Sequence, residues 1–158
     1  MNIATTIMDG LREIASYGPF WVSLVVAFIG YQQWRTARDK ARFDLYEKRF
    51  VIFQATLDFI GEVCSDAVRQ EQVVKFDIAR NEAFFLFGRD KGILDYLQLL
   101  RQKAQDHQTF KSQAEGIPGP PNPERSHYVQ QMLKIKEWFF NQPDVARTKF
   151  AAYLSFKK

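Results

Sequence analysis

The chain has 158 residues, a formal net charge of +4 and a single cysteine, Cys64, which excludes an internal disulfide. Apolar residues make up 46% of it and charged residues 25%, with 15 Phe against only 8 Gly and 6 Pro, so a largely disordered chain is excluded. The small positive charge is divided between two regions, which argues against nucleic acid as a partner.

The first expected element is a transmembrane helix over residues 17–34, preceded by a short N-terminal segment, 1–16. No charged residue occurs from Ile14 to Trp34. At about 1.5 Å per residue this run extends roughly 30 Å, close to the thickness of the hydrocarbon core of a bilayer. A cleaved signal peptide and a buried helix of a soluble protein are the alternatives. Aromatic residues suited to the membrane interface flank the segment on both sides: Tyr17, Trp21, Tyr31 and Trp34.

Basic residues follow this segment directly. By the positive-inside rule they place the N-terminus outside and residues 35–158 in the cytoplasm, at a bacterial inner membrane. The same side chains are also suited to contact anionic lipid headgroups, as a lipid-surface sensor would require. The four residues are Arg35, Arg38, Lys40 and Arg42.

Beyond Trp34 the helix is expected to continue to about Ser65 as an amphipathic helix, because neither Pro nor Gly interrupts it before Gly61. Its apolar residues follow steps of three and four, the register of a coiled coil. The face is wide, which suits a helical bundle, while a homodimer seam is the alternative. The packing stripe consists of Phe43, Tyr46, Phe50, Phe53, Leu57 and Ile60.

A second helix is expected between about Asp66 and Phe87, with a polar first half that can also form a loop. Gly88 is a candidate C-cap, and Asp90 a candidate N-cap for a third helix. Such short spacing predicts an antiparallel helical hairpin. The third helix carries one shared face, formed by Ile93, Leu97, Leu100, Ala104 and His107.

A proline-rich loop is expected over residues 115–124, because its prolines and glycines do not sustain a helix. Ser126 is a candidate N-cap for a fourth helix. A final short helix is expected to start at Pro143. No convincing strand pattern occurs, so the predicted class is all-α: a cytoplasmic bundle of about four to five helices. The face expected on the fourth helix consists of Tyr128, Met132, Ile135 and Phe139.

Signatures of catalysis are absent from the sequence. It contains no phosphate-binding glycine loop, no nucleophile elbow and no Cys/His cluster with the spacing of a metal site. His107 lies on an apolar face and is expected to be structural, and Cys64 is expected to be a buried thiol rather than a reactive one. We therefore expect no enzyme activity, no cofactor, no metal and no small-molecule ligand.

Several segments resemble a group of small bacterial single-pass membrane proteins with a cytoplasmic helical domain. The segment Q-Q-W-R-T-A-R-D-K-A-R-F-D-L-Y-E-K-R-F (32–50) is similar to the exit from their membrane helix. E-A-F-F-L-F-G (82–88), I-L-D-Y-L (93–97), E-W-F (137–139) and F-A-A-Y-L-S-F (150–156) are also similar. The resemblance implies single-pass topology and a helical core, and it implies no activity or catalytic residue.

Three functions are consistent with these features. The first is a membrane-anchored helical interaction or scaffold protein that forms homo-oligomers or binds a membrane protein partner. The second is a sensor of anionic lipid surfaces. The third is a small membrane effector of the toxin or defence type, for which Ser23 and Ala27 provide only a weak helix-association motif.

Overall fold

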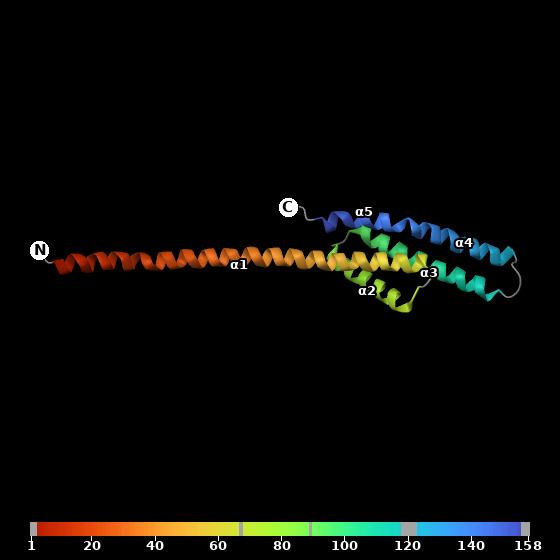
Figure 1. Cartoon of the computed structure of the whole chain (residues 1–158), viewed down its shortest axis with the longest axis horizontal. Helices are drawn as coiled ribbons and strands as arrows, with labels where there is room; N and C mark the ends of the chain where they lie inside the picture. The colour runs from red at the N-terminus through yellow and green to blue at the C-terminus, as the bar shows by residue number, and fades with distance from the viewer. Residues whose placement is uncertain (1–2, 67, 89, 118–122, 156–158) are drawn as a thin grey trace. The chain divides into compact units, whose positions relative to one another are not determined.

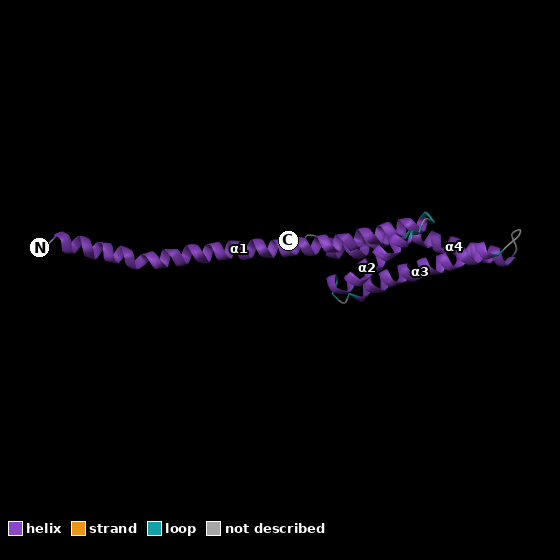
Figure 2. Ribbon diagram, turned by 90° about the horizontal axis from the view of Figure 1, so that it is seen from below, coloured by secondary structure: helices purple, strands orange, loops and turns teal. Residues whose placement is uncertain are grey.

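The computed structural model describes the backbone of residues 3–66, 68–88, 90–117 and 123–155, with side chains from Phe20 onward. Its described residues form helices and no strands (Figure 2), which confirms the all-α class. The chain divides into two compact units, residues 1–44 and 45–158, and each is described here by itself. The helices are α1 (Ile3–Cys64), α2 (Gln70–Leu86), α3 (Lys91–Gly116), α4 (Pro123–Phe140) and α5 (Gln142–Leu154).

Helix α1 begins at Ile3, within the segment 1–16 that was expected to precede the first helix. It has no break between Trp34 and Phe43, so the predicted continuation of this helix is confirmed. It ends close to the predicted residue: Ser65 N–H donates to the Gly61 carbonyl at 3.0 Å. Asp66 follows with a φ of 56°, a left-handed conformation that stops the helix.

The expected transmembrane segment is not supported by the structure. Within the described residues, none of the helices combines the length and the mean hydropathy that a membrane crossing requires. The apolar run from Phe20 to Ile29 is followed by Gln32, Gln33 and then Arg35, and these polar side chains lower the hydropathy of any longer window.

In the second unit, α1 and α2 run antiparallel, and so do α2 and α3. On α1 and α2, Phe59 stacks on Phe76 with ring centroids 4.1 Å apart, and Arg49 Nε donates to the Leu86 carbonyl at 3.0 Å. In both pairs an earlier position on α1 meets a later one on α2. The predicted hairpin of α2 and α3 is confirmed in the same way by the contacts Arg101–Asp77 (3.1 Å) and Arg80–Gln98 (2.7 Å).

Helices α3 and α4 lie side by side and also run antiparallel (Figure 1). Near one end, Phe110 stacks on Tyr128 with centroids 6.3 Å apart. Near the other, the Tyr96 hydroxyl donates to the Gln142 carbonyl at 3.2 Å, at the start of α5. α4 and α5 together therefore run along α3, and the chain bends between them where Pro143 prevents a continuous helix.

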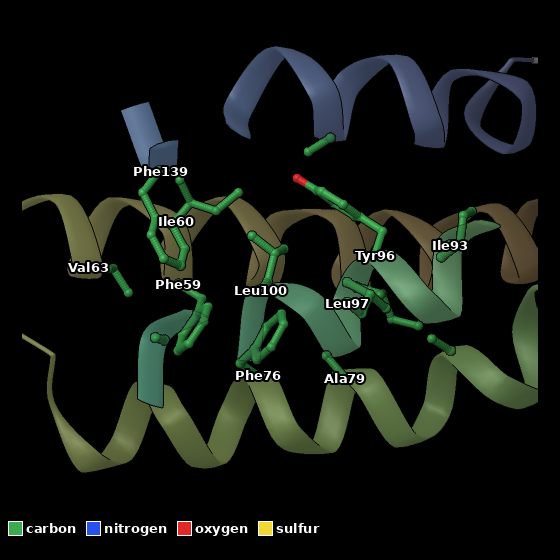
Figure 3. Close-up of a cluster of buried hydrophobic side chains, with 14 of the residues drawn as sticks. Phe59, Ile60, Val63, Phe76, Ala79, Ile93, Tyr96, Leu97, Leu100 and Phe139 are labelled. Atoms are coloured by element: carbon green, nitrogen blue, oxygen red, sulfur yellow. The ribbon is translucent and has the colours of Figure 1, made fainter. Parts of the chain in front are cut away.

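The core of the second unit lies between the C-terminal part of α1 and α2, α3, α4 and α5; Figure 3 shows part of it. Phe76 and Phe139 are fully buried, and they meet α1 at Phe59 and Ile60. The whole predicted face of α3 is buried, which confirms that prediction. The buried residues of α3 include Ile93, Leu97, Leu100, Ala104 and His107.

Local signals predicted two helix ends well. Gly88 has a φ of 63° immediately beyond α2, the conformation in which glycine is favoured. The Asp90 carboxylate accepts a hydrogen bond of 2.8 Å from the Gly92 N–H and caps α3 as predicted. The predicted cap at Ser126 is wrong, because α4 begins at Pro123, where proline suits the first turn.

The proline-rich loop expected over residues 115–124 is shorter in the described structure. α3 continues to Gly116, and Ile117 follows it in an extended conformation. α4 begins at Pro123. The remainder of the expected loop, residues 118–122, lies outside the described residues.

Candidate functional site

The first unit presents a helical surface that is apolar on all sides. Its large apolar side chains from Phe20 to Ile29 are between 48% and 63% exposed. Because they occupy nearly consecutive positions, they surround the helix and do not form a single face. An uncovered apolar surface of this kind is typical of a segment that contacts a membrane or another protein. The residues are Phe20, Trp21, Val22, Leu24, Val25, Val26, Phe28 and Ile29.

Aromatic and basic side chains follow this segment. Tyr31 and Trp34 are each 56% exposed, with ring centroids 6.1 Å apart. The guanidinium of Arg38 lies 5.0 Å from the centre of the Trp34 ring, a cation–π contact one turn further along. Tyr17 lies outside the residues whose side chains are described. All four basic candidates are exposed: Arg35, Arg38, Lys40 and Arg42.

The predicted packing stripe of α1 is buried unevenly. Ile60 is only 1% exposed, whereas Phe43 and Phe50 are 57% and 37% exposed. Phe53 contacts Phe150 of α5, with ring centroids 5.4 Å apart. Tyr46, Phe53 and Leu57 are half-buried. The most deeply buried positions follow the neighbouring edge of the helix: Ile52, Thr56, Phe59, Ile60 and Val63.

A polar cluster that the sequence did not predict lies where α1, α3 and α4 meet. Asp66 stands at its centre, just beyond α1. Its Oδ1 is 3.3 Å from His107 Nε2 of α3, and its Oδ2 accepts a hydrogen bond from Lys136 of α4. The backbone carbonyl of Asp66 accepts a further, long hydrogen bond of 3.5 Å from Lys111. Three helices are thus connected through one residue.

The electrostatics of the cluster are set by burial and by its two lysines. The side chain of His107 is 1% exposed, and neither ring nitrogen has a hydrogen-bond partner among the described residues. Burial lowers the pKa of His107 and outweighs the opposing attraction of Asp66, so the imidazole is neutral at pH 7. Burial acts to raise the pKa of Asp66, but the hydrogen bond and charge of Lys136 outweigh it and hold that pKa below its usual range.

Two surface cavities adjoin the cluster. One, of about 230 Å³, has the polar side chains of Gln108 and Ser112 in its wall, beside His107. The other, of about 240 Å³, extends toward Arg125 and Met132 of α4. The two cavities share three residues, which are Asp66, Lys111 and Glu115.

Cys64 lies near the cluster but is not activated by it. The thiol is half-buried, and burial raises its pKa, with Lys136 lowering it and Asp66 raising it to smaller extents. A protonated thiol is a poor nucleophile. Among the described residues, no three His, Cys, Asp or Glu side chains approach closely enough to hold a metal ion. The geometry of the cluster is that of a polar junction between helices.

Sequence reasoning missed this junction because its members are far apart along the chain. Asp66 and Lys136 are separated by 70 positions, and no local spacing relates them. The one available signal was His107, a polar residue on an otherwise apolar helical face. A buried polar side chain generally requires a polar neighbour, so a partner was implied without being identified.

Comparison of the chain with protein-family models, with curated proteins and with solved structures finds no match. The features that bear on the function of the chain are therefore its own exposed surfaces. Two of these are informative: the all-round apolar segment of the first unit, and the exposed apolar residues of the helical bundle.

Proposed function

We propose that this chain is a membrane-attached helical interaction protein without enzymatic activity of its own. Residues 17–34 enter a bacterial inner membrane, and residues 35–158 form a cytoplasmic helical domain that binds a partner. The observation that supports the proposal is the exposed apolar surface from Phe20 to Ile29, which none of the described side chains of the first unit, Phe20 to Asp44, covers. The resemblance of 32–50 to small bacterial single-pass membrane proteins is consistent with it.

The hydrophobic effect supports this location of the segment. Burying a half-exposed Val, Leu or Phe side chain contributes roughly 1 kcal/mol. Six such side chains, together with Trp21 and Ile29, are clustered in less than three turns of helix. Contact with lipid tails therefore offers the segment several kcal/mol that water does not. The backbone adds no cost, since all hydrogen bonds of a helix are satisfied within it.

Membrane attachment is tested by fractionating cells that express the full chain. The intact protein is expected in the membrane pellet and to resist extraction with alkaline carbonate. Val25→Arg places a charge in the middle of the apolar segment, at a cost of about 2.5–3.5 kcal/mol. It is expected to increase the soluble fraction roughly 50-fold or more. Leu133→Arg, at a position of α4 that is 54% exposed, is the matched control and is expected to stay in the pellet.

Recovery of the intact chain in the soluble fraction would contradict membrane attachment. If alkaline carbonate releases the protein from the membrane pellet, the protein is bound at the membrane surface and is not inserted. For orientation, the exposed basic residues after Trp34 favour a cytoplasmic C-terminus. A reporter that is active only in the cytoplasm, fused after Lys158, is expected to be active. An inactive reporter would show that the chain has the opposite orientation.

A second candidate is a sensor of anionic lipid surfaces. It is favoured by the exposure of Arg35, Arg38, Lys40 and Arg42 directly after the apolar segment. Each basic side chain near an anionic surface contributes about 1 kcal/mol. Replacing all four by Gln leaves the apolar segment intact, so on this hypothesis the variant stays in the membrane but loses its preference for anionic over neutral vesicles. An unchanged preference eliminates the sensor.

The partner-binding part of the proposal is tested by crosslinking. The bundle carries large apolar side chains that its own core does not cover, among them Phe85 of α2 (81% exposed) and Phe140 of α4 (62% exposed). Crosslinked complexes of defined mass are expected for the detergent-solubilised chain. A chain that remains monomeric and captures no partner would contradict an interaction function, whatever the result of fractionation.

A further inference from the structure

Helix α2 has two apolar faces, and only one of them is covered. Val73, Phe76 and Ala83 are buried against the rest of the bundle. On the opposite side, Val74, Ile78 and Phe85 are 46%, 54% and 81% exposed. In an isolated bundle this second face would be exposed to water. A surface helix usually carries polar residues on the side that faces water, so an apolar face in this position is unusual.

The exposed face has the spacing of a helix–helix seam. Val74, Ile78, Asn81 and Phe85 are separated by steps of four, three and four, which are d and a positions of successive heptads. Asn81 is also exposed. We call these four residues the outer face of α2. A helix that presents such a seam packs against another helix with the same period.

We propose that the outer face of α2 pairs with the outer face of α2 from a second copy of this chain, in antiparallel orientation. In this arrangement Ile78 of each copy packs beside Asn81 of the other, around a two-fold axis. Val74 of each copy then meets Phe85 of the other, so the smallest and the largest apolar side chains share a layer. Both copies therefore use the same surface, the outer face of α2, as a two-fold symmetric dimer requires.

Charge decides the orientation. In an antiparallel pair the e positions of the two helices lie next to each other, and here they are Lys75 and Glu82. Each copy would contribute one of each, giving two opposite-charge contacts across the axis. A parallel pair would offer no such contact, because Lys75 would lie beside Gln70 and Glu82 beside the Asp77 position. The sequence of α2 thus favours the antiparallel dimer.

The existing contacts of these residues do not prevent the pairing. Lys75 lies 2.7 Å from Glu71 on its own helix, but both side chains are more than half exposed and can rearrange at little cost. Glu82 has no ion pair within the described part of the chain. Asp77 contacts Arg101 at 3.1 Å, which keeps it directed toward α3.

The size of the face indicates a modest affinity. α2 has 17 residues and is about 25 Å long, so one helix pair buries less than the roughly 800 Å² per partner of a standard interface. A dissociation constant in the micromolar range is expected. The inference concerns the second unit alone and does not require membrane attachment, so Val25→Arg, which tests that attachment, is expected to leave the dimer unchanged.

The first test measures self-association of the full chain in mild detergent by sedimentation equilibrium. Phe85→Glu is expected to raise the dissociation constant of the dimer roughly 30-fold or more. It places a charge in each of the two layers in which Phe85 of one copy meets Val74 of the other. Leu133→Glu, at a position of α4 that is 54% exposed, is the control and is expected to change it less than about threefold. Circular dichroism checks that both variants keep their helical content.

The second test reverses the charges. Lys75→Glu and Glu82→Lys are each expected to weaken the dimer about tenfold, and the double variant K75E/E82K to restore it to within about threefold. Three results would overturn the proposal: a wild-type monomer across the concentration range, an unchanged dimer in Phe85→Glu, and no restoration in the double variant. Loss of vesicle binding by Phe85→Glu in a chain that is always monomeric would assign the face to lipid instead.

Discussion

The buried imidazole of His107 makes acid sensitivity the most informative property to measure. Its pKa is lowered, chiefly by burial, while Asp66 at 3.3 Å acts in the opposite direction. A lowered pKa means that the unfolded chain binds a proton that the folded chain does not. The contribution of His107 to the free energy of unfolding is therefore fully present above the unfolded pKa of about 6.5, and it is lost as the pH falls below that value.

The magnitude follows from linkage. One proton taken up only by the unfolded state changes the free energy of unfolding by about 1.4 kcal/mol per pH unit at full effect. Between pH 7.5 and pH 5.5, an imidazole that stays neutral in the folded state accounts for up to about 1.4 kcal/mol of lost stability. His107→Leu removes the titrating group, and with it this part of the pH dependence.

The assay is urea denaturation followed by circular dichroism at both pH values. His107→Leu is expected to be nearly as stable as the wild type at pH 7.5, because it removes two ring nitrogens that have no hydrogen-bond partner among the described residues. At pH 5.5 it is expected to be more stable than the wild type. Leu133→Ala, which removes no titrating group at an exposed position, is the control and is expected to keep the wild-type pH dependence.

Two results would refute this reasoning. An equal loss of stability in His107→Leu would assign the pH dependence to other groups. A wild-type protein that becomes more stable between pH 7.5 and pH 5.5, with the gain abolished by His107→Leu, would show that attraction to Asp66 exceeds the cost of burying the charge.

Three further predictions concern the bundle. Phe76→Ala is expected to cost about 3–5 kcal/mol in urea denaturation, because this fully buried ring stacks on α1, whereas Phe140→Ala, at an exposed position, is expected to cost less than about 1 kcal/mol. Gly88→Ala is expected to cost about 1 kcal/mol by the same assay, through its φ of 63° alone, since a Cβ there has no atom within 4 Å. Tyr153→Phe removes a hydroxyl that donates to Asp90 and lowers the pKa of that carboxyl, so NMR titration is expected to show that pKa raised.

Features encoded by neighbouring residues were predicted well. Gly88 and Asp90 mark a helix end and a helix start because their conformations and hydrogen bonds involve residues at most a few positions away. The face of α3 was predicted for the same reason, since a helix repeats every 3.6 residues. Ser126 misled because a possible cap does not by itself determine where a helix begins, and Pro123 already suits the first turn.

Features that depend on which helices become neighbours were predicted less well. The stripe from Phe43 to Ile60 follows a good heptad spacing, yet the bundle buries an adjacent edge, with Ile52 and Val63 fully covered. α2 is apolar on two sides, and sequence periodicity does not choose between them. The choice depends on the fit of whole side-chain layers, such as the stack of Phe59 on Phe76.

The sequence by itself determined that this protein is helical, where most of its helices begin and end, and which segment carries an all-round apolar surface. These properties follow from propensity, capping and periodicity, which act over a few residues. Only the tertiary structure brought Asp66, His107 and Lys136 together and left one face of α2 uncovered. Both result from packing between segments far apart in the chain, which is decided by shape and burial across the entire bundle.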